Sequence, residues 1–93
     1  MYDSLPNKKK KLQRACFTRD KCCQFVDSNG KKCGAKRALK IHHILPKKEY
    51  PHLAFSLSNV ITICQKHHLW IHQNDRYVAY VPIFKRIIKE KGE

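Results

Sequence analysis

The chain has 93 residues, enough for one small domain whose thin hydrophobic core needs a disulfide or a metal to stabilise it. Its formal net charge is +13; residues 1–48 contribute +11 (14 Lys/Arg, 3 Asp) and residues 49–93 only +2 (6 Lys/Arg, 4 acids). Such a charge favours nucleic acid as a partner over an anionic membrane surface. No apolar run approaches the roughly 18–20 residues of a membrane span, and none reads as a signal peptide.

Five cysteines and six histidines are the residues most able to bind a metal. A chain without a secretory signal is expected in a reducing compartment, where cysteine mixed with histidine indicates metal binding rather than disulfides. The odd number of cysteines also fits poorly with a closed disulfide set. We therefore expect a structural metal site.

The N-terminal segment is rich in lysine. Residues 1–7 are predicted to be disordered, and residues 8–19 to form a short helix with Leu12 and Cys16 on its apolar face. Cys16 is expected to pack there as a small apolar residue. A solvated helix end without a partner is the alternative to phosphate binding. The residues predicted to hold nucleic-acid phosphates, here and in a later loop, are Lys8, Lys9, Lys10, Lys11, Arg14, Lys47 and Lys48.

Residues 20–38 show no periodic pattern. Asn29-Gly30, in the middle of this segment, predicts a two-residue hairpin turn there. Such a turn brings Cys22 or Cys23 back towards Cys33, so that two thiols from this segment can share one metal ion.

The second half of this metal site is predicted further along the chain. Cys64 and His67 are separated by two residues at the start of a predicted helix, which is the spacing of half a tetrahedral zinc site. Buried free thiols are the alternative to a zinc site, and Cys22 is the alternative to the first ligand. The expected zinc ligands are Cys23, Cys33, Cys64 and His67.

Two strands are predicted in the middle of the chain. Residues 39–44 alternate in a strand pattern, which places His42 and His43 on opposite faces. Residues 46–58 form a long connection, of a length that is often functional in small domains. Residues 60–63 are predicted to form the second strand.

A helix is predicted directly after the second strand, over residues 65–74. His68 and His72 are four residues apart and share one of its faces, which makes them a ready pair of metal ligands. Leu69 and Trp70 are expected to pack in the core.

A closing helix is predicted over residues 82–91, with Pro82 at its first position. The preceding residues 76–81 are ambiguous. Tyr77 and Tyr80 are expected to pack in the core, with stacking on bases as the alternative.

These residues, in this order, resemble the HNH nuclease family over about residues 12–75. The chain departs from the family pattern in two places: Cys64-x-x-His67 stands where zinc-stapled members have Cys-x-x-Cys, and Cys23 and Cys33 are widely split. The matching segments are 39–46 (LKIHHILP), 59–64 (NVITIC), the pair His67-His68 and the upstream run 19–25 (RDKCCQF).

The resemblance implies an α+β chain with a small ββα-metal (His-Me finger) nuclease fold, a structural zinc knuckle, an N-terminal basic helix and a C-terminal helix. It also implies a division into a flexible basic N-terminus (1–11), the HNH nuclease domain (12–75) and a C-terminal helical extension (76–93). By the same resemblance, His43 stands at the general base, and Asn59 holds the loop and orients that base through a backbone hydrogen bond. The implied ligands of one catalytic divalent cation are His42, His68 and His72.

The implied function is that of a metal-dependent DNA endonuclease or nickase that hydrolyses phosphodiester bonds. The implied cofactors are one catalytic Mg²⁺ or Mn²⁺, with Zn²⁺ or Ni²⁺ as alternatives, and one structural Zn²⁺. The expected partner is double-stranded DNA, while a monomer, a homodimer and a targeting partner protein all stay open. Small members of the family are associated with homing or with phage, so we expect a cytoplasmic protein of a bacterium or a phage-infected cell. The alternative function is a zinc-stapled nucleic-acid-binding module without catalysis.

Overall fold

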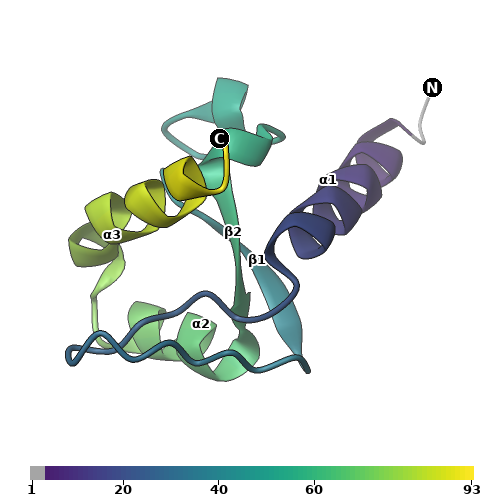
Figure 1. Ribbon diagram of the computed structural model, residues 1–93. Coiled ribbons are helices and arrows are strands. Elements are labelled where there is room, and N and C mark those ends of the chain that lie inside the picture. The colour runs from purple at the N-terminus through teal and green to yellow at the C-terminus, as the bar shows by residue number, and fades with distance from the viewer. Residues whose placement is uncertain (1–3) are drawn as a thin grey trace.

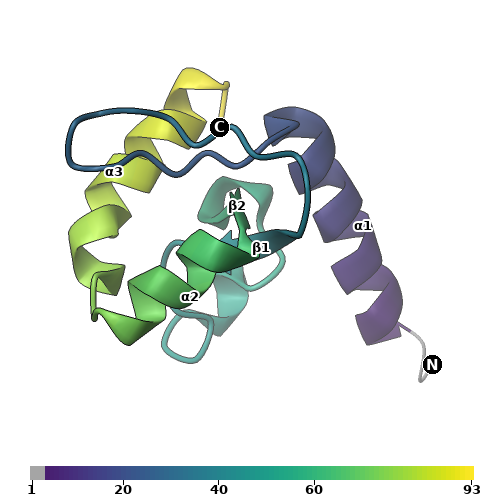
Figure 2. The ribbon, with the colours of Figure 1, turned by 90° about the horizontal axis from the view of Figure 1, so that it is seen from below.

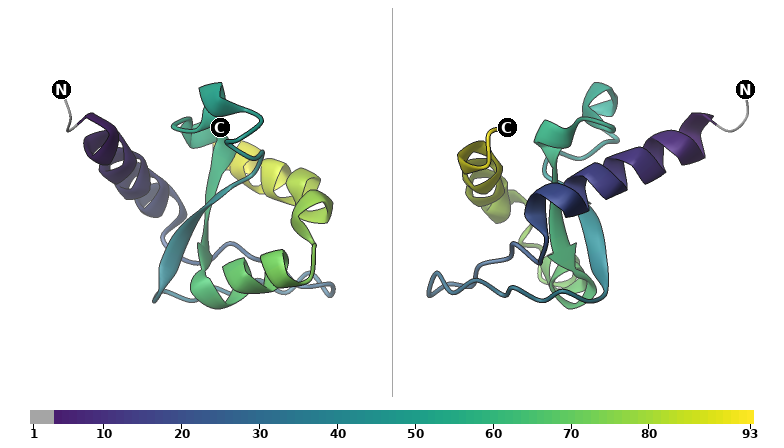
Figure 3. Two further views of the ribbon diagram at one scale, coloured as in Figure 1. Left: turned by 180° about the vertical axis from the view of Figure 1, so that it is seen from behind. Right: turned by 45° about the vertical axis from the view of Figure 1, so that its right-hand side comes forward.

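The computed structural model describes residues 4–93 and forms a two-stranded antiparallel sheet between helices (Figure 1). Helix α1 stands on one side of the strand pair and α3 on the other, while α2 runs across one end, as Figure 3 shows from two further directions. This is the expected α+β, ββα arrangement with an additional helix at each end of the chain. The elements, including two 3₁₀ turns η1 and η2, are α1 (Ser4–Asp20), β1 (Leu39–His43), η1 (Pro51–Leu53), η2 (Leu57–Asn59), β2 (Val60–Cys64), α2 (Gln65–Gln73) and α3 (Tyr77–Glu90).

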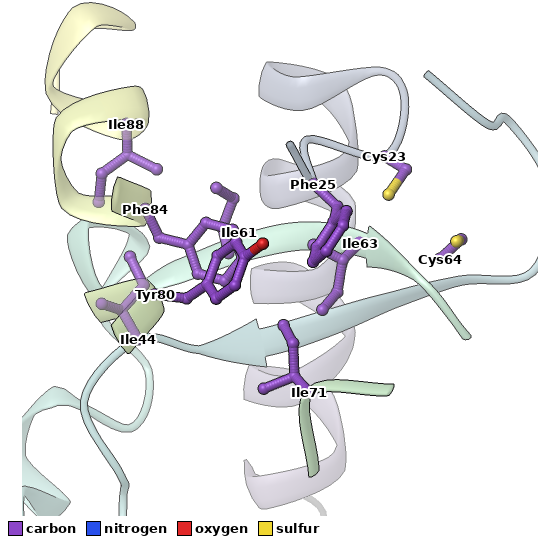
Figure 4. Packing of buried hydrophobic residues seen from close by; sticks show 10 residues of the cluster. All are labelled: Cys23, Phe25, Ile44, Ile61, Ile63, Cys64, Ile71, Tyr80, Phe84 and Ile88. Atoms are coloured by element: carbon purple, nitrogen blue, oxygen red, sulfur yellow. The ribbon is translucent and has the colours of Figure 1, made fainter. Parts of the chain in front are cut away.

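Both faces of the sheet are covered, and all five residues of β2 are therefore buried. The larger core lies between the sheet, α2 and α3, and Figure 4 shows Ile61, Ile63 and Phe84 within it. A smaller core lies under α1, where Leu12 and Cys16 pack against Val60. The expected packing of Cys16 is confirmed, since it is fully buried.

Helix α1 begins at Ser4, four residues before the predicted start. The expected disorder of residues 1–7 is therefore wrong for residues 4–7, while residues 1–3 lie outside the described part of the chain. Pro6 is compatible with the earlier start, because the first turn of a helix has no intrahelical acceptor for its N–H groups. None of the helices in residues 4–93 has the length and apolar character needed to cross a membrane.

The turn at Asn29-Gly30 is longer than predicted. The chain reverses through the three residues 28–30, because Asp27 N–H donates to the carbonyl of Lys31 at 3.0 Å and Gly30 N–H to that of Asp27 at 2.9 Å. Within the turn, only Gly30 has a positive φ, of 80°, whereas the predicted two-residue turn needs a positive φ at Asn29 as well. The Asp27 carboxylate stabilises the observed form by accepting from the N–H groups of Asn29 and Lys31.

Two predictions about the C-terminal half are wrong. Helix α3 begins at Tyr77, so Pro82 lies inside it rather than at its first position. The missing N–H leaves the carbonyl of Val78 without its helical donor, and Val78 is 78% exposed, so solvent can satisfy that carbonyl. Leu69 and Trp70 are 46% and 39% exposed rather than core residues, because α2 buries only Ile71 fully.

A buried ion pair joins α1 to the start of β2. Arg19 Nε donates to Asp20 at 2.7 Å, and the two side chains are 9% and 0% exposed. The guanidinium also donates to the carbonyls of Leu57 (2.7 Å) and Val60 (2.6 Å), while Asp20 accepts from the N–H of Thr62 at 2.8 Å. Burial alone would raise the pKa of Asp20, but Arg19 and this N–H outweigh it and hold the pKa below its ordinary value.

Replacing Asp20 by alanine is expected to lower the free energy of unfolding by about 3–5 kcal/mol, because the Arg19 guanidinium is left buried without its counter-charge. Urea unfolding followed by circular dichroism at saturating zinc measures this. Glu90→Ala is the matched control: Glu90 pairs with Arg86 at 3.7 Å on the exposed surface, and its loss is expected to change stability by at most about 1 kcal/mol. Equal effects of the two substitutions would contradict the stabilising role of the buried Arg19–Asp20 ion pair.

Candidate metal centres and active site

Three imidazoles meet between β1 and α2. One ring nitrogen each from His42, His68 and His72 lies within 4.8 Å of the other two. His68 and His72 share one helical face because they are four residues apart, and their ring centroids are 4.6 Å from one another. His42 comes from the strand and is 2% exposed. The three histidines implied as ligands of the catalytic cation are thus brought together.

The surroundings favour the neutral form of two of these rings, His42 and His68. Burial, followed by repulsion from His68, His72 and His43, lowers the pKa of His42 to about 3. Burial and the neighbouring His72 and Lys40 also lower the pKa of His68. A neutral imidazole offers the lone pair that a metal ion requires, so the donor set fits a divalent cation.

His43 lies on the opposite face of β1 from His42, as the strand alternation predicted. Its Nε2 is 2.9 Å from the carbonyl oxygen of Ala54 in the long connection. A carbonyl only accepts, so Nε2 carries the hydrogen and the neutral ring leaves Nδ1 as an acceptor. This arrangement holds His43, which is only half-buried, in the tautomer that a proton acceptor needs.

Asn59 fastens the two ends of the long connection together. Its side chain is 3% exposed, accepts from the N–H of Leu45 at 2.9 Å and donates to the carbonyl of Leu45 at 3.0 Å. A longer contact of 3.4 Å reaches the carbonyl of Leu53, next to Ala54. Asn59 therefore fixes the two ends of the loop that contains Ala54, and its implied role in orienting the base stays a prediction.

Tyr77 joins this site without having been predicted to do so. Its hydroxyl donates to the backbone carbonyl of His43, and its ring lies 5.0 Å from that of His42 and 5.9 Å from that of His72. The expectation that Tyr77 and Tyr80 pack is confirmed, since both border the larger core. No local pattern in the sequence could have shown the contact, because it joins residues 34 positions apart.

Cys23, Cys33, Cys64 and His67 form a second cluster, in which one ligand atom from each lies within 4.8 Å of all the others. The Nδ1 atom of His67 is 3.3 Å from Sγ of Cys64 and 3.9 Å from Sγ of Cys23. In a tetrahedral zinc site, bond lengths near 2.1 and 2.3 Å place such atoms about 3.6 Å apart. The cluster is therefore compatible with a zinc site, and it contains Cys23 rather than Cys22.

The buried thiol of Cys23 needs a cation beside it to ionise. Burial raises the pKa of the Cys23 thiol to about 12, and a bound metal ion removes such a proton on coordination. The two cysteines outside the cluster have other contacts. Cys16 Sγ is 3.2 Å from the hydroxyl of Thr62, and Cys22 Sγ is 3.6 Å from Nε2 of Gln24.

The basic residues expected to hold phosphates are all exposed. Lys8 is the only one of them with a described aromatic contact, since its Nζ lies 5.9 Å over the ring of Phe55. That contact places the lysine-rich part of α1 beside the loop that carries Ala54. Binding of nucleic acid at these positions stays a prediction. The exposed residues are Lys8, Lys9, Lys10, Lys11, Arg14, Lys47 and Lys48.

Two antiparallel strands followed by a helix, with three imidazoles converging from the strand and the helix, define the class of ββα-metal folds. A family model described as HNH endonuclease matches residues 27–74, just over half of the chain. The chain belongs to the HNH endonuclease family, as the sequence resemblance predicted. Membership implies a nuclease-type or nucleic-acid-binding function, a nucleic-acid partner and divalent metal ions. No curated protein and no solved structure matches the chain.

Proposed function

We propose that the chain is a metal-dependent DNA endonuclease or nickase. The observation that carries this proposal is the pairing of His43, held by Ala54 as a proton acceptor, with a cluster of three imidazoles that begins at the adjacent residue His42. A binding module needs neither an oriented base nor a second metal cluster beside it. An oriented base beside a cation site built from β1 and α2 is the arrangement that hydrolysis of a phosphodiester requires.

In the proposed reaction, Nδ1 of His43 accepts a proton from a water molecule, and the water oxygen attacks phosphorus. The bond from phosphorus to the 3′-oxygen then breaks, and this oxygen takes a proton from a solvent water molecule, leaving a 5′-phosphate and a 3′-hydroxyl end. His43 keeps its orientation through the Nε2–H donated to Ala54, while Asn59 fixes the loop that supplies this carbonyl. A divalent cation bound by His42, His68 and His72 would supply Lewis-acid stabilisation of the phosphate and the leaving oxygen.

The chemistry of the three histidine ligands favours some divalent cations over others. Imidazole nitrogens suit zinc, nickel and other transition metals, whereas Mg²⁺ prefers carboxylate, carbonyl and water oxygens. The three ligating side chains proposed here are all histidines. We therefore expect Mn²⁺, Ni²⁺ or Zn²⁺ to support activity better than Mg²⁺.

Plasmid nicking tests the proposal. Purified protein is incubated with supercoiled DNA and each metal in turn, and wild type is expected to relax the plasmid. His68→Ala is expected to lose nicking while retaining DNA binding. Gln65→Ala is the matched control, since Gln65 is exposed on the same helix and lies outside both clusters. Binding of DNA by wild type without nicking in any metal would overturn the proposal and support the non-catalytic module.

A further inference from the structure

A hollow of about 770 Å³ lies beside α2, away from the proposed catalytic cation site. Its walls come from the hairpin near Phe25, from α2 and from the first turns of α3. Lys66 and Trp70 line it from α2, at positions four residues apart on one helical face. His68 and His72 project from the opposite side of the same helix, because two residues correspond to a rotation of about 200°. An occupant of the hollow therefore leaves the three-histidine cluster free.

One wall of the hollow is a rigid group of aromatic rings. The ring of Phe25 stacks on those of His67 at 4.0 Å and Tyr80 at 5.0 Å, and meets that of Trp70 edge-on at 5.6 Å. Figure 4 shows the rings of Phe25 and Tyr80 side by side within the larger core. Trp70 is nevertheless 39% exposed. A fixed, partly exposed indole is suited to stack on a flat ring.

The charges around this wall are mostly positive. Lys66 and Arg76 both line the hollow and are exposed. The only acid among the lining residues is Asp27, whose Oδ1 already accepts from two backbone N–H groups of its own turn. In a chain with a net charge of +13, this combination complements an anion that carries a flat ring.

We infer that this hollow binds an unpaired nucleotide of a nucleic acid, with its base on Trp70 and its phosphate near Lys66 and Arg76. A duplex keeps the faces of its bases stacked against one another, so only an unpaired nucleotide can offer a free face to the indole. The inference deepens the proposed nuclease function and rests on it for one point: the substrate is a nucleic acid with an unpaired segment next to the cleavage site. Figure 2 shows α2 between the strand pair and the viewer, so that a substrate crossing this single helix would reach both sites.

The only tryptophan of the chain reports directly on the hollow, because Trp70 forms part of its wall. Titrating wild type with a short oligothymidylate is expected to quench the tryptophan fluorescence in a saturable manner. An abasic oligomer of equal length carries the same phosphates without bases, and it is expected to bind without comparable quenching. Equal quenching by both oligomers would overturn the inference.

Trp70→Leu keeps an apolar side chain but removes the stacking surface. Fluorescence anisotropy of a labelled oligothymidylate is expected to show at least about fivefold weaker binding than wild type, with binding of a blunt duplex changed less than twofold. Lys66→Gln is expected to weaken oligothymidylate binding and to reduce its salt dependence. Lys89→Gln is the control, since Lys89 is exposed on α3 outside the hollow. Binding by Trp70→Leu within twofold of wild type would overturn the inference.

The outcomes separate this inference from the proposed function. Wild type that nicks plasmid but shows no base-dependent quenching refutes only the unpaired-nucleotide site. Wild type that shows quenching but nicks no DNA in any metal supports the site and refutes the nuclease proposal.

Discussion

Replacing His43 by alanine is expected to slow plasmid nicking by about 10²–10⁴-fold, the usual contribution of a positioned general base. The reason is geometric: Ala54 accepts the hydrogen of Nε2 at 2.9 Å, so Nδ1 is the nitrogen left to take a proton from water. DNA binding is expected to stay within twofold, because the side chain is half-buried and the exposed lysines are untouched. Single-turnover nicking rates at saturating metal, with gel-shift titrations beside them, measure both quantities.

His52→Ala is the matched control for this substitution. His52 lies in the same connection between the strands, is exposed, and belongs to neither candidate metal cluster. Nicking is expected to stay within about twofold of wild type, since no described contact joins His52 to the catalytic residues. If His43→Ala nicked as fast as His52→Ala, the base would have to be another group.

The sequence predicted the elements that depend on local spacing. The alternation of residues 39–44 placed His42 and His43 on opposite faces, and the four-residue step from His68 to His72 placed those two on one helical face. Both arrangements occur in the structure, because side-chain direction along a strand or helix follows from the local backbone geometry. The grouping of Cys64 with His67 likewise follows from their three-residue spacing at the start of a helix.

The errors arose where a local pattern had more than one solution. Asn29-Gly30 fits a two-residue turn, yet Asp27 accepts two N–H groups in the longer turn and leaves only Gly30 with a positive φ. Pro82 fits the first position of a helix, yet a proline is also tolerated further in where the freed carbonyl faces solvent. Each choice depends on neighbours that the local pattern does not specify.

The long-range contacts to backbone carbonyls, around the proposed base and around Arg19, could not be predicted from the sequence. The carbonyl of Ala54 belongs to the backbone and carries no residue-specific mark. Tyr77 reaches the carbonyl of His43 across 34 positions, and Arg19 reaches those of Leu57 and Val60 across 38 and 41 positions. These side chains bind backbone groups far along the chain, so residue spacing contains no information about them.

The two candidate metal clusters share helix α2 and adjoin one another in the sequence. Cys64 ends β2 and His67 lies in the first turn of α2, so a metal ion bound there would anchor the junction of strand and helix. His68 follows directly, and His72 lies one turn further. Loosening the first cluster therefore releases the start of the helix that carries two of the three proposed catalytic ligands.

Cys64→Ser is accordingly expected to lower the midpoint of thermal unfolding by roughly tens of degrees. If the loss of stability is larger still, the variant shows no cooperative transition. Structural zinc contributes an apparent 10–16 kcal/mol in small domains, which is as large as the whole stability of about 5–15 kcal/mol typical of a folded protein. Circular dichroism melting curves measure the effect, and elemental analysis is expected to find one zinc equivalent fewer than in wild type. Adding a strong chelator to wild type is expected to produce the same loss of structure.

Cys22→Ser provides the matched control, because Cys22 neighbours the cluster in sequence but contributes no atom to it. Its melting midpoint and zinc content are expected to equal those of wild type, since its thiol accepts a hydrogen bond from the Gln24 side chain and lies outside the cluster. A wild-type melting curve that is indifferent to chelator, or equal midpoints for Cys64→Ser and Cys22→Ser, would show that the core holds the fold without a metal. In that case the four-residue cluster would be a set of free thiols and a histidine, and the link between the two centres would fail with it.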